Sequence, residues 1–176
     1  LSTDDVGSHS VAVGPYALQN QNLATATDTY NTAVGYNAGG SITTGTGNTF
    51  VGGQTGDNTI DSVNNTAMGW DALGADSGGD NTAVGAVSGA YVTSGTNNTF
   101  LGHDAGRAGS PGGAISTGSN EVCIGDENVT EAHIQVDWTV ASDQRDKTDF
   151  TALDLGLSFV NALEPLTYKW DKRSKY

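Results

Sequence analysis

Basic residues are scarce in this chain of 176 residues. Seven Lys and Arg stand against 20 Asp and Glu, and the net charge is −13. Such a chain repels a phosphate backbone, so no nucleic-acid partner is expected. One cysteine, Cys123, excludes an intrachain disulfide framework and a cysteine-rich metal site. No apolar run approaches the roughly 18 residues that a membrane-spanning helix requires, so no membrane insertion is expected. We also expect no metal ion and no cofactor.

The few basic residues are unevenly distributed along the chain. Residues 1–140 contain 14 acidic residues and a single base, Arg107, whereas residues 141–176 contain six of each. Glycine follows the same division, with 24 of its 25 positions before residue 141. This change predicts a leading segment at 1–8, a repeat domain at 9–140 and a charge-balanced segment at 141–176. The start at Leu1, without Met or a signal segment, indicates a piece of a longer polypeptide.

The acidic part repeats a five-residue unit that ends in glycine. The closing glycines of the five close copies follow one another at a nearly constant spacing, and this regularity predicts a solenoid of stacked coils. Positions are counted below from this closing glycine, which is position 0. The close copies are Asn31–Gly35, Asn48–Gly52, Asn65–Gly69, Asn81–Gly85 and Asn98–Gly102, and the weaker ones are Ser10–Gly14 and Glu121–Gly125.

The residues before each closing glycine are typical of β-strands. Position −3 is Thr in the close copies, and positions −2 and −1 are Ala, Phe, Val, Met or Leu. Alternation places −3 and −1 on one face of the strand and −2 on the other. A lone coil of about 17 residues cannot enclose apolar groups on both faces, so we expect coils to stack and other chains to complete the core. A second short strand is predicted in the other half of each coil, for example within 38–45 and 89–95.

The predicted fold class is therefore mainly β, with short-coil β-roll or β-solenoid repeats in a homotrimer and a small α+β segment at the C-terminus. A purely structural scaffold is one interpretation of the repeats. An ice-binding face is another, although only one Thr column is regular. Position +1 varies and includes Tyr36, Trp70 and His103, which are candidates for contact with a carbohydrate. His103 is expected to lie without partner ligands, so no metal site is predicted there.

The repeats resemble the head repeats of trimeric bacterial adhesins. They are still more similar to the Asn-Thr-Ala-Val-Gly-x-x-Ala-Gly repeats of bacteriophage tail-fibre and appendage proteins, over residues 9–125. This resemblance implies a homotrimer of short-coiled β-rolls.

The segment after residue 140 carries a possible nucleophile. A strand is predicted at 132–140 and an amphipathic helix at 148–163, with Ala141-Ser-Asp-Gln-Arg-Asp-Lys147 between them. A serine hydroxyl can attack a carbonyl if a neutral amine takes its proton. Lys147 would need burial or a neighbouring cation, such as Arg145, to supply that amine.

Two motifs in this segment resemble the opening of the peptidase S74 domain, the C-terminal intramolecular chaperone of phage endosialidases, tail spikes and neck appendages. They are Ser142-Asp-x-Arg145-x-Lys147 and Leu163-x-Pro165-x-x-Tyr168-x-Trp170. The resemblance implies that the segment drives trimerisation and then cleaves the chain at Ala141–Ser142. Ser142 would be the nucleophile and Lys147 the general base, with Asp143 and Arg145 in supporting roles. The family domain continues further with long helices, so only its start is expected here.

Together these features predict a structural and receptor-binding segment of a phage tail fibre. The expected partners are two further copies of the chain, a host cell-surface receptor such as a glycan, and other tail proteins. The expected location is the virion, after assembly in the host cytoplasm. A head domain of a bacterial trimeric autotransporter adhesin and a passive spacer remain alternatives. Apart from a single self-cleavage, no enzymatic activity is expected.

Overall fold

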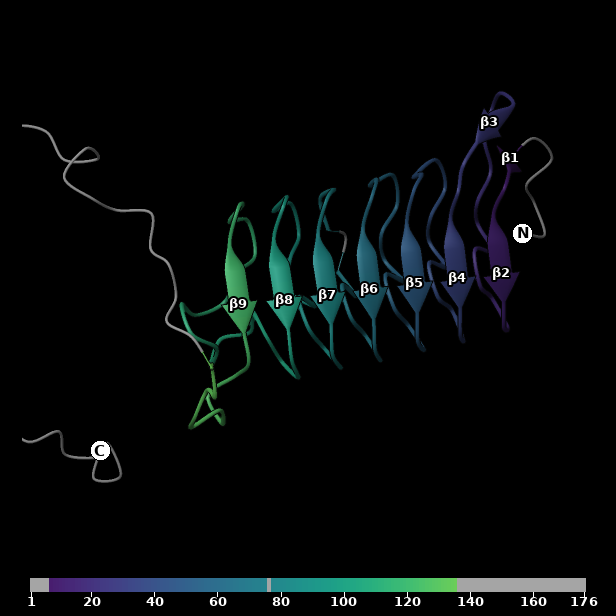
Figure 1. Ribbon diagram of the computed structural model, residues 1–176. Coiled ribbons are helices and arrows are strands. Elements are labelled where there is room, and N and C mark those ends of the chain that lie inside the picture. The colour runs from purple at the N-terminus through teal and green to yellow at the C-terminus, as the bar shows by residue number, and fades with distance from the viewer. Residues whose placement is uncertain (1–6, 76, 136–176) are drawn as a thin grey trace, which may run out of the picture. The chain divides into compact units, whose positions relative to one another are not determined.

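A parallel β-solenoid is built mainly from one seven-stranded sheet, to which successive coils each contribute one strand (Figure 1). The structure is a computed structural model that describes residues 7–75 and 77–135. The chain divides into two units, Leu1–His133 and Ile134–Tyr176, and the solenoid lies in the first. Its strands are β1 (Gly7–Ser8), β2 (Val11–Val13), β3 (Thr27–Asp28), β4 (Thr32–Val34), β5 (Thr49–Val51), β6 (Thr66–Met68), β7 (Thr82–Val84), β8 (Thr99–Leu101) and β9 (Val122–Ile124).

The seven strands that precede closing glycines form one sheet. Their order is β2-β4-β5-β6-β7-β8-β9, all neighbours are parallel, and β1 pairs separately with β3. Equivalent repeat positions pair directly, as in Thr32 with Thr49 and Val34 with Val51. Each repeat position therefore forms a column along the solenoid axis, and the predicted β-solenoid fold is confirmed. Among the described residues, no helix has the length and apolar character needed to cross a membrane.

The predicted second strand of each coil is wrong, because residues 38–45 and 89–95 form turns. Positions +2 and +4 have a positive φ in successive coils, for example 55° at Asn37 and 58° at Gly39. Two left-handed residues so close together bend the backbone away from an extended strand. A strand was also predicted at residues 132–140. Its described part, residues 132–135, does not form a strand. The rest of it, the domain boundary at 140 and the helix at 148–163 lie outside the described residues.

The −2 side chains point into the coil and form its core. Ala33, Phe50 and Phe100 are fully buried. Large and small side chains complement each other in some coils: Ala67 shares its coil with Leu73 at position +4, whereas Phe50 shares its coil with Gly56. A Cβ on Gly56 would lie 2.6 Å from the Phe50 ring, so the glycine leaves the space that the ring fills. The single chain thus packs one apolar face of its sheet by itself.

The asparagines at position −4 form a buried ladder. Asn48 Oδ1 accepts a hydrogen bond from the Asn65 backbone N–H at 2.9 Å, and the same bond recurs between neighbouring coils from Asn31 onward. Asn48 Nδ2 donates to the Ser62 carbonyl at 2.9 Å. These asparagines are not turn residues, because the positive φ falls one position earlier, for example 59° at Asn64. The ladder therefore joins each coil to the next by hydrogen bonds inside the core.

The Asn65 rung of the ladder is incomplete. The coil from Gly69 to Gly85 is one residue shorter than its neighbours, and Asn65 Nδ2 is buried without a hydrogen-bond partner among the described residues. We predict that Asn48→Ala lowers the free energy of unfolding by about 2–3 kcal/mol, and Asn65→Ala by about 1 kcal/mol. Asn65→Ala costs less because it removes the acceptor Oδ1 together with Nδ2, a buried donor that has no partner among the described residues. Chemical unfolding followed by circular dichroism measures both, and equal losses would contradict the difference between the rungs.

Candidate functional site

The outer face of the sheet carries an exposed apolar column at position −1. Val13, Val34, Met68, Leu101 and Ile124 are 36–55% exposed in the single chain. We call this set, with the partly exposed Val51 and Val84, the −1 column. Beside it runs the position −3 column, which is Thr in the five central strands and Val at both ends. The alternation that the sequence predicts is therefore confirmed, with −2 inside and −1 and −3 outside.

This outer face has the character of an interface. Parallel sheets occur almost only where both faces are covered, and here the described residues cover one. Seven strands at about 4.8 Å spacing give the −1 column a length of about 29 Å. Contiguous apolar surface on this scale marks an interaction site in soluble proteins. The arrangement therefore defines an apolar stripe along one side of a stiff, repetitive rod.

The three predicted ligand-contact residues lie in one column but do not form a common site. Tyr36, Trp70 and His103 all stand at position +1 and are separated from one another by the coils of Gly53 and Ala86. Coils stay in register past the closing glycine, because the Val87 N–H donates to the Trp70 carbonyl at 2.8 Å. Two coils correspond to about 10 Å, so the rings are too far apart to grip one small ligand together.

Two of these side chains are held by neighbours in adjacent coils. The Tyr36 ring packs edge to face with Tyr16, with 5.7 Å between the ring centroids. Trp70 Nε1 donates to Gln54 Oε1 at 3.2 Å. Both Tyr36 and Trp70 are 56% exposed, so their rings remain open to solvent on one side. Their role as carbohydrate contacts stays a prediction.

His103 has carboxylate neighbours that the sequence analysis did not expect. Its Nδ1 lies 3.4 Å from Asp126 Oδ2 and 3.7 Å from Asp104 Oδ2. Asp126 stands at position +1 of the next coil, directly beside His103 in the +1 column. The shared repeat position was visible in the sequence and would have revealed this pair.

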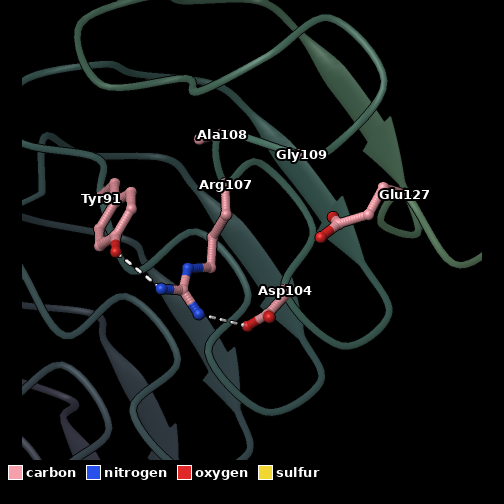
Figure 2. A pocket seen from close by; sticks show the side chains of 6 residues that line it. All are labelled: Tyr91, Asp104, Arg107, Ala108, Gly109 and Glu127. Atoms are coloured by element: carbon pink, nitrogen blue, oxygen red, sulfur yellow. Dashed lines mark hydrogen bonds and ion pairs between the residues drawn. The ribbon is translucent and has the colours of Figure 1, made fainter.

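Arg107 and Asp104 line a cavity of about 230 Å³ beside this cluster (Figure 2). Arg107 donates to Asp104 Oδ1 at 2.8 Å and to the Tyr91 hydroxyl at 2.7 Å, and its guanidinium lies over the Tyr91 ring. The hydrogen bond to Asp104 is the main reason why the pKa of Arg107 is raised, so this base stays charged. Glu127 lies on the opposite side of the cavity. The cavity occurs where residues 108–119 interrupt the regular period.

Ala141, Ser142, Asp143, Arg145 and Lys147 lie outside the described residues. Their predicted roles in cleavage therefore stay predictions.

Residues 142–175 match the family model Peptidase_S74, described as chaperone of endosialidase. The match begins at Ser142, where the chain's composition changes. The chain has no match among the curated proteins or among the solved structures. A β-solenoid joined to a segment that matches this chaperone family fits a protein of the tail-fibre type.

Proposed function

We propose that the chain is a segment of a homotrimeric fibre, in which three solenoids pack through their −1 columns and a C-terminal chaperone segment brings the chains together. The exposed −1 column carries this proposal. Val34 is 36% and Met68 49% exposed on a parallel sheet whose other face is fully packed. Burying this column between chains removes apolar surface from water at about 25 cal/mol per Å². Two further copies of the chain can bury this column, because every copy has the same exposed apolar column.

The proposed fibre is a phage tail fibre or a related appendage, located in the virion after assembly in the host cytoplasm. The solenoid suits a rigid rod, because every coil is tied to the next by the asparagine ladder and the parallel sheet. The exposed rings of Tyr36 and Trp70 support contact with a host cell-surface receptor such as a glycan. The remaining fibre would join other tail proteins.

Light scattering on the purified chain tests the trimer. Three chains of 18.0 kDa should give about 54 kDa. A stable single chain at micromolar concentration would overturn the proposal. If the trimer forms, a binding assay on host cells separates a receptor-binding segment from a passive spacer.

The segment at 142–175 supports a second step, self-cleavage between Ala141 and Ser142. The spacing of Ser142 and Lys147 is that of the serine and lysine in the chaperone-family motif that this segment resembles. The match to the family model starts at Ser142. In this step the Ser142 hydroxyl attacks the Ala141 carbonyl while Lys147, as a neutral amine, takes its proton. The C–N bond between Ala141 and Ser142 then breaks as Lys147 passes the proton to the Ser142 amine, which leaves an ester between the Ala141 carbonyl and Ser142 Oγ. Water hydrolyses this ester, which frees a carboxylate at Ala141 and restores the Ser142 hydroxyl.

Self-cleavage predicts two products, one ending at Ala141 and one beginning at Ser142. Expression from the full-length gene followed by mass spectrometry should detect both in the wild type. Ser142→Ala should abolish cleavage because it removes the attacking oxygen, and Lys147→Arg should do so because guanidinium stays protonated. Lys172→Arg, outside the motif, is the matched control and should cleave normally. The same products from the Ser142→Ala variant would remove the dyad from the account.

A further inference from the structure

The chain has three histidines, and each lies beside a carboxylate in the described structure. His9 lies 3.1 Å from Asp28, and His133 lies 3.5 Å from Glu131. His103 differs, because two carboxylates from different coils approach the same nitrogen, Nδ1. Among the described residues, this is the one group of three or more potential ligands that could hold a metal ion.

The two carboxylates are fixed in place by other residues. Asp126 is only 9% exposed in its side chain, and Asn128 donates to it from the backbone N–H at 2.9 Å and from Nδ2 at 3.1 Å. These two hydrogen bonds hold the Asp126 carboxylate in one orientation. Arg107 binds Asp104 through Oδ1, which leaves Oδ2 on the side of His103. The 65% exposed imidazole leaves an approach from solvent.

We propose that His103, Asp104 and Asp126 bind one first-row transition-metal ion, of which zinc is the expected example. Their ligand atoms lie within 4.8 Å of one another. Ligands on a tetrahedral zinc ion, with bonds of about 2.0–2.1 Å, are roughly 3.3 Å apart. The His103–Asp126 separation of 3.4 Å already fits this value, and the His103–Asp104 separation of 3.7 Å needs little change. The two carboxylate oxygens, which lie within 4.8 Å of each other, would draw together by up to about 1.5 Å on binding.

Charge and ligand chemistry both favour such an ion. Asp104, Asp126 and Glu127 carry three negative charges around the cluster and cavity, against one positive charge on Arg107. A divalent cation brings this group to neutrality. The imidazole nitrogen selects zinc and its neighbours over Mg²⁺ and Ca²⁺, which prefer oxygen ligands. Water fills the remaining coordination positions, because no fourth protein ligand lies within the group.

The ion would link two neighbouring coils, those of β8 and β9, next to residues 108–119, where the repeat period is irregular. The coil that runs from His103 to Asp126 is longer than a regular coil, such as the one from Tyr36 to Gly53. The additional residues lie in the turns at 108–119, between β8 and β9. A metal bridge from one coil to the next stabilises the folded form, because the unfolded chain does not bring these ligands together. This proposal does not depend on the fibre function.

Isothermal titration calorimetry with zinc chloride tests the site on the full chain, with any polyhistidine tag removed. We expect one zinc ion per chain and a higher thermal midpoint with zinc. His103→Ala should weaken binding by about 100-fold or more and abolish the thermal shift. Asn128→Ala should weaken zinc binding by about 10-fold, because it loosens Asp126 without removing a ligand. Circular dichroism should show that both variants fold, since neither side chain is part of the core.

His9→Ala and His133→Ala are the matched controls, because among the described residues neither histidine belongs to a group of three potential metal ligands. Both should bind zinc like the wild type. Absence of zinc binding in the wild type, or equal binding by the His103→Ala variant, overturns the proposal. Calcium binding that is at least as tight as zinc binding and indifferent to His103 also overturns it, because it would show a carboxylate site for a hard cation.

Discussion

Replacing Gly69 with alanine should cost about 3–5 kcal/mol of folding free energy and lower the thermal midpoint by about 10 °C or more. Gly69 has a φ of 135°, which disfavours any residue with a Cβ atom. An added Cβ would also lie 2.5 Å from the carbonyl oxygen of Gly85 in the next coil. That neighbour is backbone held by the parallel sheet, so it cannot move away without breaking the stack.

Gly53, in the repeat before that of Gly69, provides the matched control for this effect. It follows the closing glycine Gly52, it has no positive φ, and an added Cβ would meet only the Trp70 ring at an ordinary 3.7 Å. Gly53→Ala should therefore leave the thermal midpoint within about 2 °C of the wild type. Thermal unfolding by circular dichroism measures both variants. Equal midpoints would show that the closing glycines are not required for close stacking of coils.

Placing two glutamates in the −1 column should convert the trimer into folded single chains. Val34 and Met68 are 36% and 49% exposed in the single chain, so Val34→Glu with Met68→Glu leaves the coil interior unchanged. In the proposed trimer, the same substitutions bring six negative charges into an apolar interface. The cost of burying unpaired charge exceeds what the column gains from burial.

Ile60→Glu with Val63→Glu is the control for this double variant. These two side chains are 45% and 39% exposed, which matches the −1 column pair, but they lie outside the sheet. Light scattering should find one chain for the column variant and three for the control, with the circular dichroism of folded solenoid in both. Three chains in both variants would exclude the −1 column as the interface.

The solenoid could be predicted from the sequence because the closing glycines mark its period. Gly35, Gly52 and Gly69 are evenly spaced, and the pattern of Thr, any residue, then Val or Met before each predicts the face that every strand residue takes. The second strand was predicted wrongly, because small residues such as Ala38 and Gly39 fit an extended strand as well as a left-handed turn. The backbone conformation in the structure decides between them, because the positive φ at Gly39 belongs to a turn and not to an extended strand.

The buried role of the asparagines and the His103 cluster were missed for related reasons. Asn48 is polar and common in turns, and its burial depends on a carbonyl in the following coil, that of Ser62, which no local pattern reveals. Asp126 stands at position +1 like His103, so their shared repeat position was visible in the sequence, but the contact forms only when the two coils stack. Both features arise from contacts between coils. The apolar −1 column, in contrast, was predictable because alternation within a strand is local.

Thiol labelling of the trimer measures directly whether the −1 column is buried between chains. Met68→Cys and Ile60→Cys each place one thiol at a site that is 49% or 45% exposed in the single chain. The natural Cys123 is 2% exposed and can be replaced by alanine, which fills the same column in other coils. If the column is buried between chains, a maleimide should react at position 60 at least about 10-fold faster than at position 68, and denaturation should remove the difference. Equal rates in the native protein would show that the −1 column is open to solvent, and would exclude it as the interface between chains.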